Sequence, residues 1–271
     1  MVKQNIQKKR ISVDESLASQ PLIYGLTGTH FEHTFDLEYS SQVICAEHLR
    51  QGASDLAIIP AAEYARKKET WFIVPDLCIA APAASKKLQL FFNSGLRDIK
   101  RIAVPSLHST ETILLKIILQ EGHELNPEYI EDTGDLEHLL KRADAALQVD
   151  DAALENYNKN RNRLDLNEEW VDLTGLPFVY SVWAGREFLI EKEDIIAVKM
   201  SYEIGVRNIE MICKDYSENR QEEWGFYHDF LTKDLTYILT DTERNGLAEF
   251  FSYCFYFGLI EYIPDFHFFT F

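Results

Sequence analysis

The sequence predicts an α/β protein of two lobes, with mixed, mostly parallel sheets and a cleft between the lobes. Apolar runs of strand length alternate with amphipathic stretches of helix length up to residue 150. Two apolar runs, 88–92 and 178–183, read as buried strands with a self-contained α/β segment between them. We therefore expect residues 95–184 to form a lobe inserted into a second lobe, 1–94 and 185–271. Small molecules favour the clefts between such lobes.

In the first lobe, β-branched and aromatic residues predict strands at 10–13, 34–39, 56–60, 71–74 and 77–81. Pro21 and Gly25 favour a short helix over 21–26, because Pro suits a first helical turn and Gly a helix end. Residues 41–51 are expected to form a helix that stops at Gly52 and has an apolar face made of Val43, Ile44 and Leu49.

The inserted lobe begins with a predicted strand at 99–105, followed by a loop and an amphipathic helix over 111–120. A short strand at 128–130, a helix at 136–141 and a strand at 143–149 follow, and the last of these ends at Asp150 and Asp151. The polar run 156–163 and the acidic stretch 165–170 are expected to be loops.

The C-terminal part is predicted to be helical, over 194–215 and 222–239. Residues 240–243 spell a capping box for a last helix, because Thr240 is followed three residues later by Glu243. Residues 250–271 hold eleven aromatic side chains, which indicate core packing and a homodimer patch rather than an aromatic ligand box.

The chain is strongly acidic, with 44 Asp and Glu against 27 Lys and Arg and a formal net charge of −17. This charge repels phosphate backbones and anionic lipid, so we expect no nucleic-acid partner and no membrane partner. The basic N-terminus lacks the apolar run of a signal peptide, and the apolar stretch 250–260 is too short to span a bilayer. Cys45, Cys78, Cys213 and Cys254 show no paired spacing, which indicates free thiols and a cytoplasmic location.

Candidate ligand contacts lie where the predicted strands end, because ligands gather at the carboxyl ends of parallel strands. Ser109 and Thr110 offer hydroxyls at a helix start, although Ser and Thr there also serve as ordinary N-caps. Glu111 would repel an anion at that place, and Lys87 could supply positive charge or be solvated. The scattered histidines form no metal-ligand pattern, and no GxSxG, P-loop or GxGxxG motif is present. No catalytic residue stands out from the residues alone.

Several stretches resemble chorismate dehydratase, the first enzyme of the futalosine route to menaquinone. They are Ile58–Tyr64, Ile73–Ala81, Thr112–Lys116, Asp144–Leu147, Asn167–Arg186 and Thr242–Ile260. The resemblance implies a type 2 periplasmic-binding-protein-like fold in a cytoplasmic and often dimeric protein. It implies removal of water from chorismate to give 3-[(1-carboxyvinyl)oxy]benzoate without metal or organic cofactor. The substrate's own carboxylate would take the proton, so that the protein mainly positions and polarises.

The resemblance places the ligand contacts at Ala18, Ser19, Lys87, Ser109, Thr110, Glu111, Asp151 and Thr174. Several differ from the family pattern: Ala18 stands where the family has Asn, Lys87 where it has Ser, and Glu111 where it has Ser. Asp150 replaces a Gly, while Asp151 keeps its place. Loss of the Asn contact alone typically costs about 1–3 kcal/mol.

Two functions follow from these observations. The first is a chorismate dehydratase-like lyase that holds a small anionic molecule with Ser109, Thr110, Lys87 and Thr174. The second is a non-catalytic binding protein or sensor on the same fold. The related dihydroxynaphthoate synthase branch fits the strand around 178–183 less well, and an exported solute-binding protein lacks a visible signal.

Overall fold

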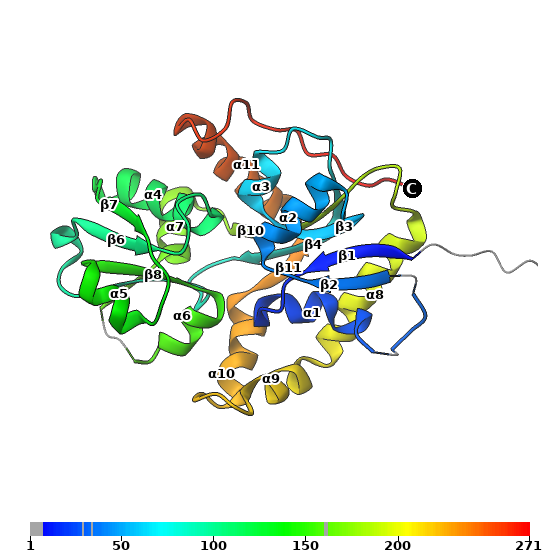
Figure 1. The fold of residues 1–271 in the computed structure, drawn as a ribbon, viewed down its shortest axis with the longest axis horizontal. Coiled ribbons are helices and arrows are strands. Elements are labelled where there is room, and N and C mark those ends of the chain that lie inside the picture. The colour runs from blue at the N-terminus through cyan, green and yellow to red at the C-terminus, as the bar shows by residue number, and fades with distance from the viewer. Residues whose placement is uncertain (1–7, 29, 34, 160–161) are drawn as a thin grey trace, which may run out of the picture.

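A computed structural model describes residues 8–28, 30–33, 35–159 and 162–271 as two α/β lobes, each built on its own sheet (Figure 1). The larger sheet has the strand order β11-β4-β10-β3-β1-β2. Its strands are β1 (Lys9–Val13), β2 (Phe35–Tyr39), β3 (Leu56–Pro60), β4 (Phe72–Ala81), β10 (Phe178–Gly185) and β11 (Thr236–Leu239). The smaller sheet has the order β7-β6-β8-β5-β9. Its strands are β5 (Leu88–Phe92), β6 (Arg101–Val104), β7 (Glu128–Glu131), β8 (Ala145–Val149) and β9 (Arg163–Asp165).

Both sheets are mixed, as predicted, but the expectation that they are mostly parallel is wrong. In the described part of the chain, β1 pairs in parallel with β2 and β3, and β6 with β7 and β8. The remaining pairings are antiparallel, because β10 enters the larger sheet between β3 and β4 and runs against both. In the same way β5 runs against β8 and β9.

The chain crosses between the lobes in two segments, 82–87 and 175–177. Strand β5 belongs to the smaller sheet, and β10 belongs to the larger one. The expected lobe boundaries at 94/95 and 184/185 are therefore wrong. They assigned β5 to the larger lobe and β10 to the smaller one, whereas each strand pairs in the opposite lobe. The two segments leave the larger sheet side by side, since Ala81 of β4 pairs with Phe178 of β10.

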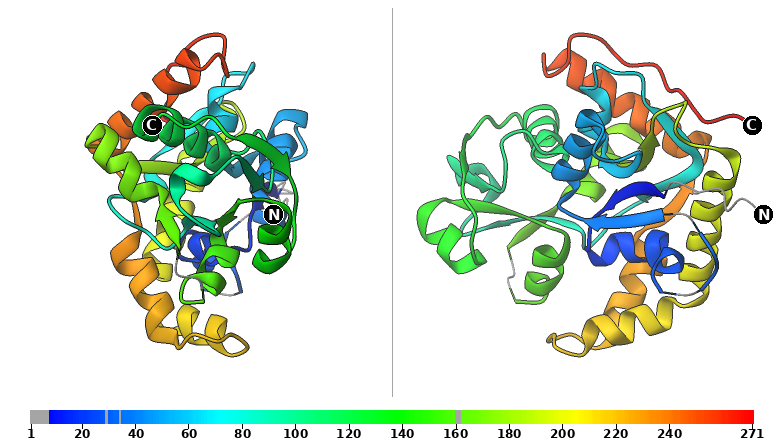
Figure 2. Two further views of the ribbon diagram at one scale, coloured as in Figure 1. Left: turned by 90° about the vertical axis from the view of Figure 1, so that its left-hand side faces the viewer. Right: turned by 45° about the vertical axis from the view of Figure 1, so that its right-hand side comes forward.

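Helices cover both faces of the larger sheet: α2 (Gln42–Gln51), α3 (Ala61–Ala65) and α11 (Asp241–Tyr256) on one, and α1 (Gln20–Ile23), α8 (Lys192–Arg207), α9 (Ile209–Ser217) and α10 (Trp224–Asp229) on the other (Figures 1 and 2). The smaller sheet carries α4 (Thr110–Ile117), α5 (Leu136–Arg142), α6 (Asp150–Asn156) and α7 (Leu166–Thr174). Short 3-10 turns lie at Leu17–Ser19, Tyr24–Leu26 and Leu96–Asp98, and π-turns at Ile118–Gly122 and Phe230–Asp234.

Three local predictions are wrong. Helix α2 packs through Cys45, Ala46 and Leu49, while Val43 and Ile44 are about half exposed, because the helix meets β3 with the opposite side. The stretch expected as a loop from 165 is helix α7, whose N-terminal N–H groups of Asn167 and Glu168 are capped by the Asp165 carboxylate. Residues Thr236–Leu239 form edge strand β11, not helix.

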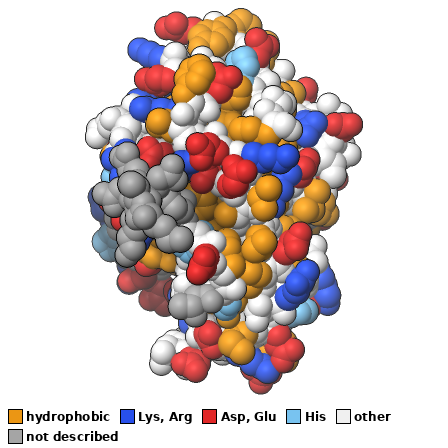
Figure 3. Space-filling view, turned by 90° about the vertical axis from the view of Figure 1, so that its right-hand side faces the viewer, with side chains coloured by type: hydrophobic (Ala, Val, Ile, Leu, Met, Phe, Trp, Pro, Cys, Tyr) orange, Lys and Arg blue, Asp and Glu red, His pale blue; other side chains and the backbone are white. Residues whose placement is uncertain are grey.

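The aromatic C-terminal part supplies core, as predicted. Phe250, Phe251 and Phe269 are buried, whereas Tyr256 and Phe271 are exposed. On the side of the larger lobe that faces away from the smaller one, apolar side chains lie among acidic and basic ones (Figure 3). The homodimer stays a prediction. The four cysteines are free and buried.

Candidate functional site

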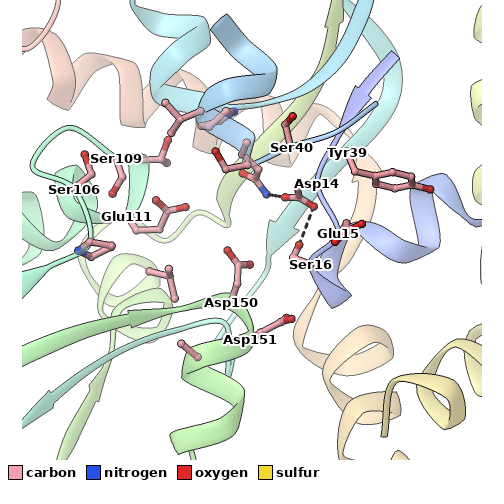
Figure 4. A pocket seen from close by; sticks show the side chains of 18 of the residues that line it. Asp14, Glu15, Ser16, Tyr39, Ser40, Ser106, Ser109, Glu111, Asp150 and Asp151 are labelled. Carbon is pink, nitrogen blue, oxygen red and sulfur yellow. Dashed lines mark hydrogen bonds between the residues drawn. The ribbon is translucent and has the colours of Figure 1, made fainter. Parts of the chain in front are cut away.

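A cleft of about 930 Å3 lies between the lobes and is lined by residues of both. The larger lobe contributes 14–16, 39–43, Pro60, Glu63, Tyr216 and Arg220, and the smaller lobe contributes 105–106, 109–111 and 149–152. Most of these residues directly follow β1, β2, β3, β6 or β8. Within each sheet, these strands run parallel to one another, so their carboxyl ends meet at one edge. The edge of each sheet faces the other across the cleft (Figure 4).

The wall on the larger lobe is fixed by a chain of side-chain hydrogen bonds that begins at Asp14, directly after β1. The buried Asp14 carboxylate accepts from the Ser16 hydroxyl at 2.9 Å and from the Gln42 amide. The Gln42 carbonyl accepts from the hydroxyl of Ser181 on β10 at 2.8 Å. Asp14 is thus held in one orientation by groups from three elements of its own lobe.

The opposite wall is the start of α4, where two predicted contacts have structural roles. The Ser109 hydroxyl caps the helix by accepting from the backbone N–H of Thr112 at 3.2 Å. The buried Thr110 hydroxyl accepts from the backbone N–H of Ala62 at 3.1 Å and so joins the smaller lobe to α3 of the larger one. Glu111 points into the cleft beside them (Figure 4).

Lys87 and Asp150 form an ion pair at the floor of the cleft. Lys87 ends the first crossing segment and is fully buried, with its ammonium 4.7 Å from the centroid of the Tyr180 ring on β10. Burial lowers the pKa of Lys87, and the negative charges of Glu111, Asp14 and Asp151 oppose this effect. Asp150 begins α6 and lines the cleft.

The lining of the cleft is strongly acidic. Its carboxylates are Asp14, Glu15, Glu63, Glu111, Asp150 and Asp151, and the one arginine among the described lining residues is Arg220. That arginine is itself engaged with acids of α6, since it pairs with Glu155 and lies 3.6 Å from Asp151. The acids converge on one space from both lobes (Figure 4). Asp150 is paired with Lys87, and Glu63 is paired with Arg50 and Arg66. An anionic ligand would therefore meet chiefly the charges of Asp14, Glu15 and Glu111.

Four of the eight predicted contacts line the cleft: Ser109, Thr110, Glu111 and Asp151. Lys87 lies behind Asp150, and Ala18 and Ser19 are buried in the turn that follows the lining residues of β1. Thr174 lies at the far end of α7, where its hydroxyl donates to the Trp170 carbonyl at 2.8 Å and accepts from the Leu176 N–H at 3.1 Å. Thr174 is therefore placed in a helix end and not in the cleft.

The sequence analysis missed lining residues at two places. Tyr39, Ser40, Ser41 and Gln42 follow β2, and the rule for strand ends would have found them if it had been applied to that strand. Tyr216 and Arg220 come from the end of α9 and the turn after it, where no local pattern in the sequence indicates a ligand site.

Two kinds of feature are absent from the described residues. No group of three or more His, Cys, Asp or Glu side chains in this part of the chain could hold a metal ion. In the same residues, no helix combines the length and apolar character that a membrane crossing requires.

Comparisons with known proteins point to one family. Residues 15–256 match a family model described as menaquinone biosynthesis. Chorismate dehydratase of Thermus thermophilus is 27% identical over 155 residues, covering 51% of this chain and 56% of that protein. The chain thus spans about half the length of this curated relative.

Solved structures show the fold. A protein of Archaeoglobus fulgidus superposes with a TM-score of 0.79 at 18% identity, covering 94% of this chain and 100% of that one. A Candida albicans protein described as having the generic periplasmic binding protein fold gives 0.71 at 13% identity, covering 95% and 92%. The aliphatic sulphonate binding protein SsuA of Escherichia coli gives 0.68 at 14% identity, covering 96% and 95%. The predicted periplasmic-binding-protein-like fold is confirmed.

Proposed function

Because the chain belongs to the menaquinone biosynthesis family, we propose that its cleft binds chorismate and removes water from it to give 3-[(1-carboxyvinyl)oxy]benzoate. The observation that carries the proposal is the position of the cleft, between the two lobes and lined by residues 109–111 and Asp151. The resemblance to chorismate dehydratases places substrate contacts at these positions. The curated relative at 27% identity is named chorismate dehydratase.

The chain's own part in this reaction is to position the substrate and to polarise it. The walls are rigid, because Asp14 is fixed through Gln42 and because Thr110 is fixed through Ala62. A rigid cleft contributes to rate by holding the reacting groups of one substrate molecule in a productive conformation. The proton acceptor is the carboxylate of the substrate itself, so the elimination needs no general base from the protein.

A second function, a non-catalytic binding protein, is favoured by the charge of the cleft. Chorismate carries two carboxylates, and three of the described lining carboxylates, Asp14, Glu15 and Glu111, have no ion pair with a basic side chain. Like charges at close range raise the free energy of the complex by about 1 kcal/mol per pair at 4 Å in water, and by more where water is excluded. A neutral or less anionic ligand avoids this cost.

Incubation of the purified chain with chorismate separates the two functions. Formation of the enolpyruvyl benzoate, followed by chromatography, supports the lyase. A thermal shift with chorismate but without product supports a binding protein. If chorismate gives neither product nor thermal shift, it is neither a substrate nor a ligand of this chain. Arg220→Gln removes the lining arginine and is expected to weaken the binding of chorismate several-fold.

A further inference from the structure

The crossing segment 82–87 places a buried cation directly behind the cleft. The Lys87 side chain is 1% exposed, whereas the side chain of its partner Asp150 is 25% exposed. The ammonium lies between the Tyr180 ring and the Asp150 carboxylate, and Lys87 itself does not line the cleft. A buried ammonium requires a nearby anion, because the loss of its hydration is otherwise uncompensated. Asp150 supplies that anion.

The backbone of Asp150 is shaped for this contact. Its φ is +50°, in the left-handed region that residues other than Gly, Asn and Asp seldom adopt. In this conformation its backbone N–H donates to the Lys87 carbonyl at 2.8 Å, while its carboxylate binds the Lys87 ammonium. Two contacts to one residue hold Asp150 in an unfavourable conformation. The Asp150 carboxylate lines the cleft (Figure 4), whereas the buried ammonium to which it is bound does not.

We propose that Asp150 is a specificity-determining residue, an internal competitor that occupies Lys87 in place of a carboxylate of the ligand. A ligand carboxylate can reach the floor of the cleft only by displacing the Asp150 side chain. The pair therefore lowers the affinity for dicarboxylates more than the affinity for monoanions or neutral molecules. The inference rests on the proposed function only in taking the cleft as the ligand site, and it applies to either of the two functions.

The test uses the full chain and a rigid dianion, benzene-1,3-dicarboxylate, with benzoate as the monoanion. Dissociation constants are measured by calorimetry for the wild type, Asp150→Gly and Glu15→Gln. Gly fits the positive φ and removes the competing carboxylate, so Asp150→Gly is expected to bind the dianion at least about tenfold more tightly. Glu15→Gln removes one charge from the lining without freeing Lys87 or Arg220, and is expected to change the affinity less than about threefold.

Lys87→Met in the Asp150→Gly background is expected to return the dianion affinity to that of the wild type. If Asp150→Gly does not fold because the Lys87 ammonium has lost its partner, Asp150→Asn is used for the same comparison. Asn tolerates the backbone conformation and lacks the charge.

Equal gains from Asp150→Gly and Glu15→Gln overturn the proposal, since they show only a general effect of charge. A gain that survives Lys87→Met also overturns it. These results are independent of turnover. A Lys87-dependent gain without any reaction of chorismate leaves the proposal standing and removes the lyase. Turnover of chorismate, with no effect of Asp150→Gly on dianion affinity, supports the lyase and overturns the proposal about Asp150.

Discussion

Arg220 of the larger lobe reaches across the mouth of the cleft to Asp151 of the smaller lobe, with the charged atoms 3.6 Å apart. The same guanidinium pairs with Glu155 one turn further along α6. All three side chains are partly exposed, so these ion pairs between the lobes contribute about 1 kcal/mol or less to stability. It biases the position of the lobes without locking it.

The first prediction concerns this clamp. Arg220→Gln is expected to leave the free energy of unfolding within about 1 kcal/mol of the wild type, while hydrogen exchange in α6 and in residues 216–222 becomes faster. The control is Arg207→Gln, which removes an exposed pair with Glu203 on α8. Equal exchange in the two variants would show that the clamp does not hold the lobes.

The second prediction concerns salt. Because the lining is acidic, the affinity for chorismate is expected to rise with ionic strength between about 10 mM and 150 mM, as the Debye length falls from about 30 to about 8 Å. Glu111→Gln should raise the affinity about threefold and weaken the salt dependence. Glu121→Gln, an exposed acid outside the lining, is the control. A fall in affinity with salt would mean that attraction governs the cleft.

The third prediction concerns a second buried lysine, Lys67. Its ammonium lies 3.4 Å from the centroid of the Tyr64 ring, and burial lowers its pKa from 10.5 to about 8. The unfolded chain keeps this proton to higher pH than the folded chain does. Between pH 8 and 10.5, unfolding therefore takes up a proton, and this group makes the free energy of unfolding rise with pH.

Lys67→Met should therefore be more stable than the wild type at pH 7 by about 1–3 kcal/mol, with a smaller difference at pH 9.5. Urea unfolding at the two pH values measures both. Lys68→Met, at the exposed neighbouring position, should show neither effect. A stability difference that does not change with pH would exclude titration of Lys67 as its cause.

The fourth prediction concerns the packing of α11 on the second crossing segment. A Cβ at Gly246 would lie 2.1 Å from the Pro177 carbonyl oxygen, so Gly246→Ala should lower the free energy of unfolding by about 2–3 kcal/mol or more. The matched change is Gly225→Ala in α10, where a Cβ meets nothing within 4 Å. There Ala should stabilise by about 0.5–1 kcal/mol. Similar stabilities for the two variants would contradict the close approach.

The strands of the fold were predictable because short runs of apolar residues in the sequence mark them. The run Leu56–Pro60 is apolar throughout and proved to be wholly buried, as a central strand requires. Direction was not predictable in the same way: nothing local distinguishes β10, which runs against its neighbours, from a parallel strand. The buried face of α2 was predicted wrongly for a related reason. Val43 and Ile44 are as apolar as the residues of α2 that pack against the sheet.

The site was predictable in its position but not in its chemistry. Strand ends located Ser109 and Asp150 near one another, because parallel strands share an edge. The engagement of the Ser109 and Thr110 hydroxyls in a cap and in an inter-lobe hydrogen bond depends on contacts that only the folded chain makes. The same is true of the pair between Lys87 and Asp150, which are far apart in the sequence.

Hydrogen exchange with and without chorismate tests the central claim, that the cleft between the lobes is the ligand site. The account predicts slower exchange in residues 14–19, 39–43, 106–112 and 149–152, from both lobes at once, with little change in α5. Slower exchange of backbone amides in one lobe alone, or only in the segments that carry the exposed apolar side chains of the larger lobe, would contradict it.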